Sequence, residues 1–405
     1  MGSILKVGVI GLGGRGHGLM RGELLPRKDV EVVHVCDLFP DRAKAGADSV
    51  EELRGVRPKQ TTDYRNVIND PDVEAVFIYT AWEQHIGIAV AALDAGKHTA
   101  VEVGGAYGIK DCWELVDAAE RSKATFMFLE NCCYDRSELM VFNMVKQGLF
   151  GEIVHAAGAY GHDLRDEIAF GAKNRHYRLR NYICRNCENY PTHDLGPIAK
   201  IMRINRGNLM LRLNSVASRS AGLHEFVRAK MPGSPLENTV FAQGDTVDTV
   251  ITCADGSTIH LMLQTTLPRY YSRNFTICGT KGMFSEENDC VMLDGITPED
   301  GNLRGNASSF HEKYDSPLWN DPEELKKHGH GGMDCLTHAA AVETFLAGTP
   351  SPIDVYDAAA WMSISCLSEQ SIRLLGAPVE IPDFTRGRWR KRADRAEGIF
   401  ALEMD

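Results

Sequence analysis

A glycine cluster directly behind an apolar run constrains the fold of this 405-residue chain more than any other feature. The run spans residues 5–10, and Gly11, Gly13, Gly14 and Gly16 follow it. In the order strand, turn and helix, such glycines permit a tight turn, let the backbone approach a pyrophosphate and let the helix pack closely on its strand. The helix N-terminus then points at the phosphates. The pattern predicts the dinucleotide-binding turn of a Rossmann domain.

An acidic residue at the end of the second apolar run indicates which dinucleotide binds. This run spans residues 30–36 and is followed directly by Asp37. A carboxylate at this position, about 20 residues beyond the glycines, accepts hydrogen bonds from the adenosine ribose hydroxyls and repels a ribose phosphate. We therefore predict NAD as the cofactor, although Arg15 within the glycine turn leaves NADP open.

Strand and helix patterns alternate through the first third of the sequence. Apolar runs at residues 75–79, 98–103 and 125–129 alternate with helical patterns, one of which begins at residue 86. This alternation predicts a doubly wound parallel sheet, in which ligands bind at the carboxyl ends of the strands. The candidate cofactor-binding residues at or just after those ends are Thr80, Trp82, Glu83, Gln84, His85, Glu102, Val103 and Asn131.

Beyond residue 131 the pattern changes to longer alternating strands. Examples are residues 153–160, 247–253 and 258–265, which predict an open, mostly antiparallel sheet with one buried face. The expected organisation is an α/β Rossmann domain at residues 1–131, followed by an α+β substrate-binding and oligomerisation domain at residues 132–405. Because an open sheet face often pairs between subunits, we expect a homo-oligomer.

The acidic charge balance limits the classes of partner. The net charge of −11 argues against a nucleic-acid or anionic-membrane partner. No apolar run is long enough for a membrane span, and residues 1–6 lead straight into the first strand, which leaves no room for a signal peptide. The 11 cysteines show no regular framework and fit free thiols in a reducing compartment. We expect a cytoplasmic protein that acts on a small molecule.

Cysteine and histidine spacings do not predict a metal site. Cys184 and Cys187 have the spacing of a metal knuckle, but no second pair accompanies them. His328 and His330 stand in a glycine-rich loop at a spacing that fits a weak site, yet no carboxylate or cysteine partner is evident for them in the sequence. Since zinc sites need three or four ligands, we expect no metal.

Several motifs together resemble the Gfo/Idh/MocA oxidoreductases. They are the glycine turn, Thr80 and His85 five residues apart, the strand-end Glu102, and the turns at residues 148–153 and 279–282. The resemblance covers nearly the whole chain. That family typically carries Glu-Lys-Pro where this chain has Glu102, Val103 and Gly104, so the lysine usually placed beside the nicotinamide and the substrate hydroxyl is missing.

More specific strings are similar to glycoside hydrolase family 109, which is known for NAD-dependent α-N-acetylgalactosaminidase activity. They lie at residues 82–85, 160–165, 190–197, 205–208, 330–334 and 382–385. Members of that family commonly carry an export signal, and they have Gln where His162 stands and Gly where Asp194 stands. The resemblance implies that Arg15, Gly16, Asp37 and the strand-end residues named above line the cofactor. It also implies that Tyr160, Arg178, Tyr190, Pro191, Thr192, His193 and Tyr271 meet the sugar.

Residue chemistry supports part of this assignment. Tyr190 and His193 are three residues apart, so one helical turn places a phenol and an imidazole on the same face as a proton-transfer pair. Pro191 suits the first turn of such a helix. Tyr160, at the end of a predicted strand, is the third catalytic candidate. The alternatives are that Tyr190 and Tyr160 are packing aromatics, that His193 is a core histidine, and that Arg178 belongs to a solvated basic loop.

The family resemblance implies a mechanism in which NAD is regenerated in every turnover. The sugar is oxidised at C3, proton loss at C2 expels the aglycone, water adds to the unsaturated sugar, and C3 is reduced again. His193 or Tyr190 would be the base, and α-N-acetylgalactosaminides or related glycosides the substrates. The alternative is an NAD-dependent sugar, inositol or glycoside dehydrogenase that accumulates NADH. A third possibility is a non-catalytic sensor, because fold alone does not fix function.

Overall fold

The computed structural model describes residues 3–298 and 301–404, so Met1 and Gly2, part of the expectation about the N-terminus, lie outside the described residues. The N-terminal sheet has six strands in the order β3-β2-β1-β4-β5-β6, and every pairing between them is parallel. This confirms the predicted Rossmann sheet. Its strands are β1 (Leu5–Ile10), β2 (Val30–Cys36), β3 (Lys59–Thr61), β4 (Ala75–Ile78), β5 (His98–Val101) and β6 (Phe126–Phe128).

Helices cover the Rossmann sheet. They are α1 (Gly14–Leu19), the π-helix η1 (Met20–Leu24), α2 (Pro40–Arg54), α3 (Tyr64–Ile68), α4 (Trp82–Asp94) and α5 (Ile109–Arg121). Helix α4 begins at Trp82, four residues before the predicted start, because Ala81 is extended and ends the preceding loop. The candidate residues 82–85 therefore form the first turn of a helix.

The second sheet is larger and mostly antiparallel, as predicted. Its eight strands lie in the order β13-β12-β11-β7-β10-β9-β8-β14, and β7 and β10 pair in parallel. Alternate side chains of β9 and β10 are buried, so one face of this sheet packs on the protein core. The strands are β7 (Ile153–Gly161), β8 (Met210–Ala217), β9 (Thr246–Cys253), β10 (Thr258–Gln264), β11 (Thr276–Gly279), β12 (Gly282–Ser285), β13 (Cys290–Leu293) and β14 (Val379–Glu380).

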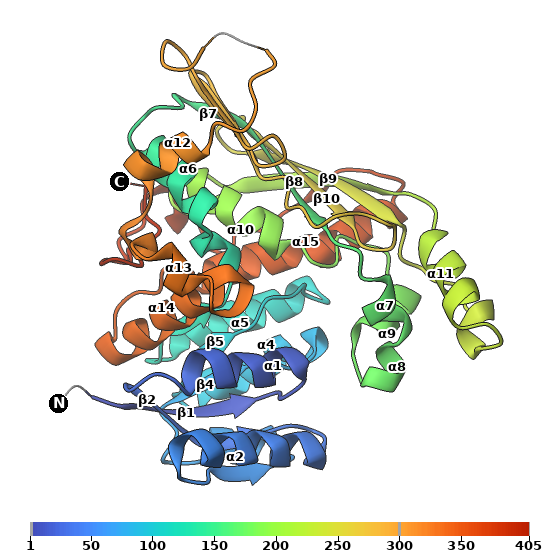
Figure 1. Cartoon of the computed structure of the whole chain (residues 1–405), viewed down its shortest axis with the longest axis vertical. Coiled ribbons are helices and arrows are strands. Elements are labelled where there is room, and N and C mark those ends of the chain that lie inside the picture. The colour runs from blue at the N-terminus through green and yellow to red at the C-terminus, as the bar shows by residue number, and fades with distance from the viewer. Residues whose placement is uncertain (1–2, 299–300, 405) are drawn as a thin grey trace.

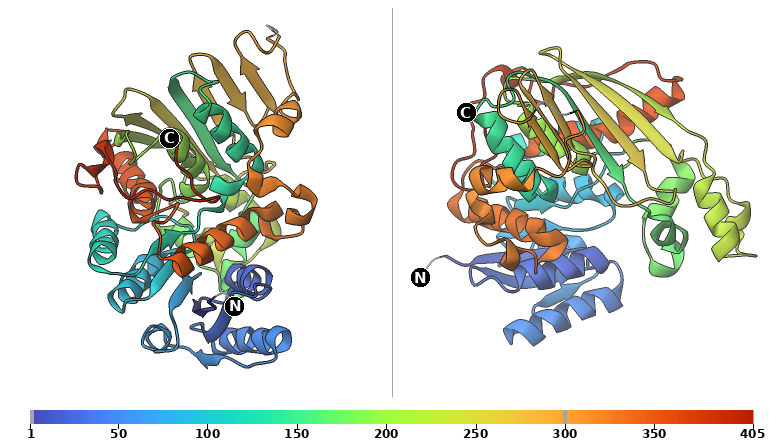
Figure 2. Two further views of the ribbon diagram at one scale, coloured as in Figure 1. Left: turned by 90° about the vertical axis from the view of Figure 1, so that its left-hand side faces the viewer. Right: turned by 45° about the horizontal axis from the view of Figure 1, so that its top comes forward.

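Helices between the two sheets join them into one body. In Figure 1, α10 (Thr192–Ile201) and α15 (Val355–Arg373) lie between the Rossmann sheet below and the large sheet above. Helix α14 (Met333–Ala347) returns to the Rossmann sheet, where His338 Nε2 lies 2.8 Å from Tyr79 Oη. The views in Figure 2 show the same layering. The domain boundary after residue 131 stays a prediction.

A group of short helices projects beside the cofactor end of the Rossmann domain. In Figure 1, α7 (Arg165–Ala169), α8 (Gly171–Asn174) and α9 (Arg178–Cys184) form this group, with α11 (Gly222–Lys230) beside it. The remaining elements are η2 (Asn131–Tyr134), α6 (Arg136–Lys146), η3 (Pro235–Asn238), α12 (Ser308–Tyr314), η4 (Pro317–Trp319), α13 (Pro322–Leu325), η5 (Gly329–Gly332) and η6 (Arg388–Arg390). Among the described residues, no helix combines the length and apolar character needed to cross a membrane.

Candidate active site

The glycine turn after β1 has the shape that a pyrophosphate needs. Gly11 has φ of +97°, and a Cβ there would lie 2.6 Å from the Tyr79 carbonyl carbon. A Cβ on Gly16 would lie 2.1 Å from Gly11 O, so both positions require glycine. A Cβ on Gly14 would meet nothing within 4 Å, and one on Gly13 only the Arg42 guanidinium at 3.5 Å. The turn therefore leaves an open cradle at the N-terminus of α1, where backbone N–H groups attract phosphate.

Asp37 shapes this cradle from the end of β2. Its Oδ2 accepts a hydrogen bond of 2.7 Å from the Leu12 N–H, and its Oδ1 accepts one of 2.9 Å from the Phe39 N–H. Each carboxylate oxygen has a second lone pair, so ribose hydroxyls can still bind. The position and charge of Asp37 fit NAD.

A partly buried ion pair joins the glycine turn to α14. Arg15 donates hydrogen bonds of 2.6 and 2.8 Å to the two oxygens of Asp334, and Asn131 Nδ2 donates one of 2.8 Å to Oδ1. Burial alone would raise the pKa of Asp334, but the hydrogen bonds from Arg15 and His330 hold it well below its usual range. Burial raises the pKa of Glu102, whose Oε2 has no hydrogen-bond partner among the described residues.

The first turn of α4 carries both buried and exposed side chains. His85 is fully buried, its Nε2 lies 2.8 Å from Thr80 O, and burial lowers its pKa to about 4. The neutral imidazole thus fixes the turn that follows β4. Gln84 is exposed on α4, and Glu83 forms an ion pair with Arg180.

Gly104 and Val103 explain how this chain differs from the Glu-Lys-Pro pattern. A Cβ on Gly104 would lie 2.5 Å from Trp82 Cδ1, so the indole occupies space that a larger residue would need. Val103 is buried and carries no ionisable group. Proton transfer at this site must therefore come from other side chains.

Glu130, His193 and Tyr190 form a chain of titratable groups. His193 Nδ1 lies 2.7 Å from Glu130 Oε1, and Tyr190 Oη lies 3.4 Å from His193 Nε2. Burial opposes ionisation of Glu130, but the His193 charge and hydrogen bond lower its pKa overall. Burial raises the pKa of Tyr190 well above its usual value. The predicted pairing of Tyr190 with His193 is present, although Tyr190 lies just before α10.

Aromatic rings extend from this chain towards the protein surface. The Tyr160 and Tyr190 ring centroids are 4.4 Å apart, and Tyr160 Oη lies 3.3 Å from His162 Nδ1. The half-exposed Tyr271 contacts the His162 ring at 5.2 Å. Burial raises the pKa of Tyr160 to about 12, so both inner phenols stay protonated at neutral pH. Asp163 pairs with Arg165 instead of His162.

Arg178 is buried, so the structure contradicts its assignment to a solvated loop face, although residues 172–175 and Arg180 around it are exposed. It starts α9, its guanidinium carbon lies 4.7 Å from the Trp82 ring and 5.0 Å from the Tyr190 ring, and its Nε lies 2.6 Å from Glu167 Oε1. Its Nη1 is buried and has no hydrogen-bond partner among the described residues. This donor, next to the Trp82 and Tyr190 rings, suits a sugar oxygen.

Pro191 and Thr192 place this cluster at the start of α10. Pro191 is the N-terminal cap of the helix and Thr192 is its first residue, with a fully buried side chain. The structure therefore brings Tyr160, Arg178, Tyr190 and His193 together with Trp82. Two further residues complete the site: Glu130, which follows the last predicted strand of the first domain and precedes Asn131, and Asp334, which lies in the motif at residues 330–334. Their positions could be read from the sequence, but their contacts with His193 and Arg15 were not predicted.

Two sequence profiles cover these two regions of the chain. The profile described as "Glycosyl hydrolase 109, C-terminal domain" matches residues 134–391, and the one described as "Oxidoreductase family, NAD-binding Rossmann fold" matches residues 5–129. The chain belongs to glycosyl hydrolase family 109. This confirms the resemblance, and the N-terminal domain of this family 109 enzyme is an NAD-binding Rossmann domain, as predicted.

Relatives of this family 109 chain match over nearly its full length. A family 109 protein of Solibacter usitatus is 39% identical over 96% of this chain and 90% of the relative. A protein of Tannerella forsythia named alpha-N-acetylgalactosaminidase is 36% identical over 96% of this chain and 88% of the relative. The solved complex of levoglucosan dehydrogenase with NADH and levoglucosan has a TM-score of 0.71 at 22% identity, over 94% of this chain and 100% of that chain. This last likeness shows a shared fold.

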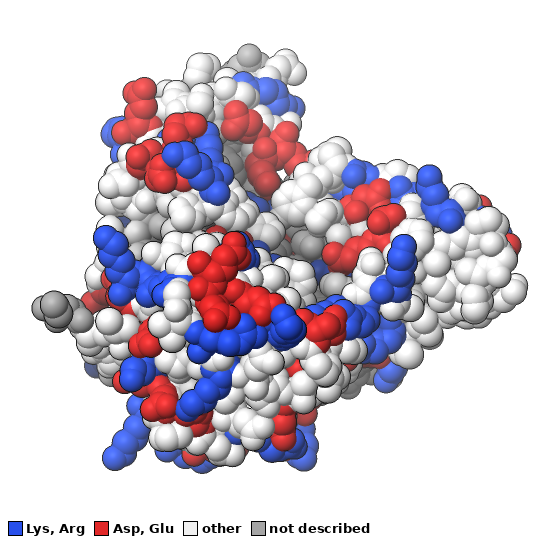
Figure 3. All heavy atoms as spheres, turned by 60° about the horizontal axis from the view of Figure 1, so that its bottom comes forward, with Lys and Arg blue, Asp and Glu red and all other residues white. Residues whose placement is uncertain are grey.

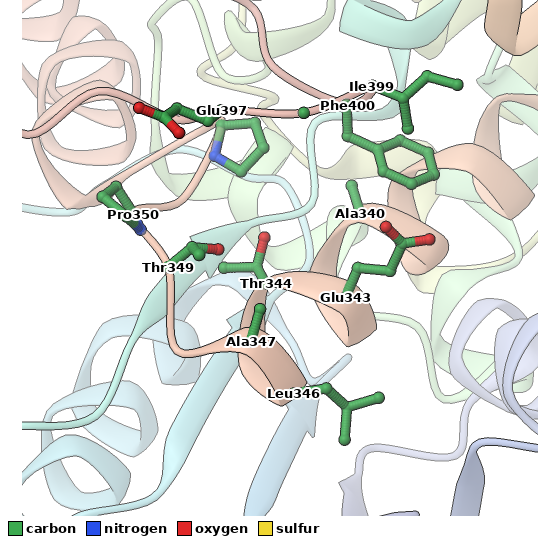
Figure 4. Close-up of a pocket in the computed structure, with 12 residues that line it drawn as sticks. Ala340, Glu343, Thr344, Leu346, Ala347, Thr349, Pro350, Glu397, Ile399 and Phe400 are labelled. Carbon is green, nitrogen blue, oxygen red and sulfur yellow. The ribbon is translucent and has the colours of Figure 1, made fainter. Parts of the chain in front are cut away.

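One surface pocket adjoins the family 109 site, and a second lies away from it. One of about 170 Å³ lies beside Trp82 and Glu83 and extends to Tyr107. A larger one of about 410 Å³ lies between the end of α14 and residues 397–400, and none of its lining residues belongs to the candidate site (Figure 4). On the face seen in Figure 3, acidic and basic side chains are intermixed.

Proposed function

We propose that this family 109 enzyme is an NAD-dependent glycosidase that acts on α-N-acetylgalactosaminides or related glycosides. The observation that carries the proposal is the buried chain Glu130–His193–Tyr190, with Val103 where an ordinary family dehydrogenase has lysine. The Tannerella forsythia relative named alpha-N-acetylgalactosaminidase supports the choice of substrate.

The residues around the glycine turn would hold NAD. Gly13 and Gly14 leave room for the pyrophosphate, Asp37 suits the ribose, and Glu102 offers an unpartnered oxygen at the end of β5. When bound there, NAD supplies reversible oxidation of a sugar carbon, which we assign to C3.

His193 is the proton acceptor in this proposal. Because Glu130 is a fully buried carboxylate, it accepts the Nδ1–H of His193 and leaves Nε2 as the basic nitrogen. Tyr190, protonated at neutral pH, lies beside Nε2 as a proton donor. A carbonyl at C3 makes the C2 hydrogen acidic, and removal of that proton expels the aglycone from C1.

Arg178 and Tyr160 would orient the sugar. The buried Nη1 of Arg178 can donate to a sugar oxygen, and Tyr160 offers a neutral phenol next to Tyr190. Holding the reacting atoms in place removes much of the entropic cost of the two proton transfers. Water then adds at C1, so no carboxylate nucleophile is required.

Contacts from α8 support retention of the cofactor between turnovers. Arg175 forms an ion pair of 2.7 Å with Asp41 and lies 4.5 Å from the Phe39 ring, and Arg42 donates to Asn174 O at 3.0 Å. These contacts cover the chain just after Asp37. The proposed reaction regenerates NAD in each turnover, so the cofactor can stay bound, and a covered binding site suits this requirement.

The test records aglycone release and NADH absorbance together. The full chain is mixed with NAD⁺ and chromogenic α- and β-glycosides, including the N-acetyl-α-galactosaminide, and a cofactor-stripped sample is the control. We expect aglycone in large excess over NADH and none from the stripped enzyme. NADH formed in proportion to sugar, without aglycone, would instead identify a sugar dehydrogenase.

A further inference from the structure

Three metal-binding side chains meet outside the candidate active site. Glu23 lies in the π-helix η1, His328 precedes η5, and Cys335 lies in the first turn of α14. One ligand atom from each side chain lies within 4.8 Å of the other two. The sequence shows His328 without a carboxylate or cysteine partner, and the fold supplies both.

The carboxylate of Glu23 is buried and faces His328 with one oxygen. The Glu23 side chain is 3% exposed, and its Oε1 accepts a hydrogen bond of 3.1 Å from the Gly329 N–H. Its Oε2 forms an ion pair with His328, whose Nδ1 lies 3.3 Å away. Two ligands held about 2.0 Å from a tetrahedral ion are about 3.3 Å apart, so this separation matches one edge of a zinc site.

We propose that Glu23, His328 and Cys335 bind a zinc ion. One thiolate, one imidazole and one carboxylate form a donor set that suits a borderline-soft ion, whereas Mg²⁺ and Ca²⁺ prefer oxygen ligands alone. The His328 side chain is 30% exposed, so a water molecule can reach the fourth position. This site goes beyond the proposed glycosidase function and does not depend on it.

The ion would join two parts of the chain that frame the cofactor end. Glu23 follows the glycine turn and α1, and Cys335 directly follows Asp334, the partner of Arg15. A bound ion would therefore fix η1 against α14 beside this ion pair. We expect its main effect to be on stability.

A second cluster of side chains that can bind metals is less suitable as a zinc site. Glu130, Cys132 and His193 also offer ligand atoms within 4.8 Å of one another. There, however, His193 Nδ1 is already hydrogen bonded to Glu130 Oε1 at 2.7 Å, which is shorter than the edge of a zinc tetrahedron. The two clusters share no residue, so variants separate them.

Cobalt(II) is the probe for the test, because a cysteine ligand gives it a thiolate charge-transfer band. The chelator-treated full chain is titrated with Co²⁺, and each variant is first checked for a native circular dichroism spectrum. We expect one Co²⁺ per chain with this band, and at least tenfold weaker binding in both Cys335→Ser and His328→Gln. Cys366→Ser, a matched cysteine change on α15, and Cys132→Ser are expected to bind as the unchanged protein does.

Competition with Zn²⁺ should displace the cobalt, and Zn²⁺ alone should raise the melting temperature of the unchanged protein but not of Cys335→Ser. His328 is partly exposed, so His328→Gln keeps the test valid if Cys335→Ser does not fold. Absence of the thiolate band in the unchanged protein would overturn the proposal. So would a band that survives Cys335→Ser and disappears in Cys132→Ser.

Discussion

His193 depends on two neighbours that come from different parts of the chain. Glu130 follows the last strand of the Rossmann sheet, and Tyr190 precedes the helix that carries His193. The buried Glu130 carboxylate orients the imidazole, and the Tyr190 phenol contacts its other nitrogen. Each residue alone has an ordinary structural interpretation, and only their combination supports the proposed proton path.

Removal of either His193 or Tyr190 from this path should reduce turnover. We expect His193→Ala and Tyr190→Phe each to lower kcat by about 100-fold or more, because each removes a positioned proton-transfer group. The measurement is steady-state aglycone release, with NAD binding checked by fluorescence. His155→Ala on β7 is the matched control and should keep near-normal kcat. Near-normal rates in both site variants would remove His193 and Tyr190 from the mechanism.

At this scale the sequence predicted residue types better than their contacts. Spacing alone brought Tyr190 and His193 together, because they are local neighbours. Glu130 and Asp334 were missed as partners, since their contacts span 63 and 319 residues of sequence to His193 and Arg15. Arg178 looked solvated because its neighbours are basic, yet two aromatic rings bury it.

Helix α14 makes the stability of the fold depend on pH. Its His338 lies between Tyr79 Oη and Asp334 O, and burial lowers its pKa to about 4, as it does for His85 on α4. The unfolded chain binds these protons near the ordinary histidine pKa of about 6.5. Since the unfolded state binds more protons between these values, the free energy of unfolding falls as pH falls from about 6.5 to 4.

Replacing His338 should flatten this dependence. In His338→Gln we expect the free energy of unfolding to change less steeply with pH near pH 5. The slope should decrease by about 1.4 kcal/mol per pH unit, which corresponds to close to one proton. Urea unfolding at several pH values measures it, with the more exposed His260→Gln as the control. If the free energy of unfolding had the same pH dependence in the unchanged protein and in His338→Gln, His338 would not be the source of this effect.

Helix α8 should slow the release of NAD. In Arg175→Ala we expect the NAD dissociation rate to rise by about twofold to fivefold, because the substitution removes both the exposed ion pair with Asp41 and the cation–π contact with Phe39. Stopped-flow fluorescence during displacement of NAD measures the rate. Lys44→Ala removes the Lys44–Asp48 pair of α2 and should leave the rate unchanged. An unchanged rate in Arg175→Ala would show that α8 does not retain the cofactor.

Elements with strong periodicity could be predicted, and those made by tertiary contact could not. The apolar runs of β1, β2 and β4 and the alternation of β9 and β10 indicate their strands directly. The short β3 is mostly polar and becomes a strand because it pairs with β2. Nothing in the local sequence of α14 indicates that it packs on the Rossmann sheet.

The outer face of the large sheet is the place where we expect subunits to associate. Val216 on β8 and Val250 on β9 are 56% and 45% exposed. They lie on the same face, because Val250 pairs directly with Asn214, and Asn214 and Val216 are two residues apart on β8. We expect Val216→Glu with Val250→Glu to convert a homo-oligomer into monomers, as measured by light scattering after gel filtration. Val56→Glu on the Rossmann domain is the control. A monomeric unchanged protein would contradict the expected oligomer.

In the proposed reaction, the dinucleotide-binding domain and the proton-transfer cluster act together on one sugar. The most direct measurement is hydrolysis of the preferred glycoside in D₂O, followed by NMR of the released sugar. The proposed reaction removes the C2 hydrogen and replaces it from solvent, so each product molecule should carry deuterium at C2 and keep its original hydrogen at C3. A released sugar with no deuterium at C2 would contradict the elimination mechanism and favour direct displacement at C1.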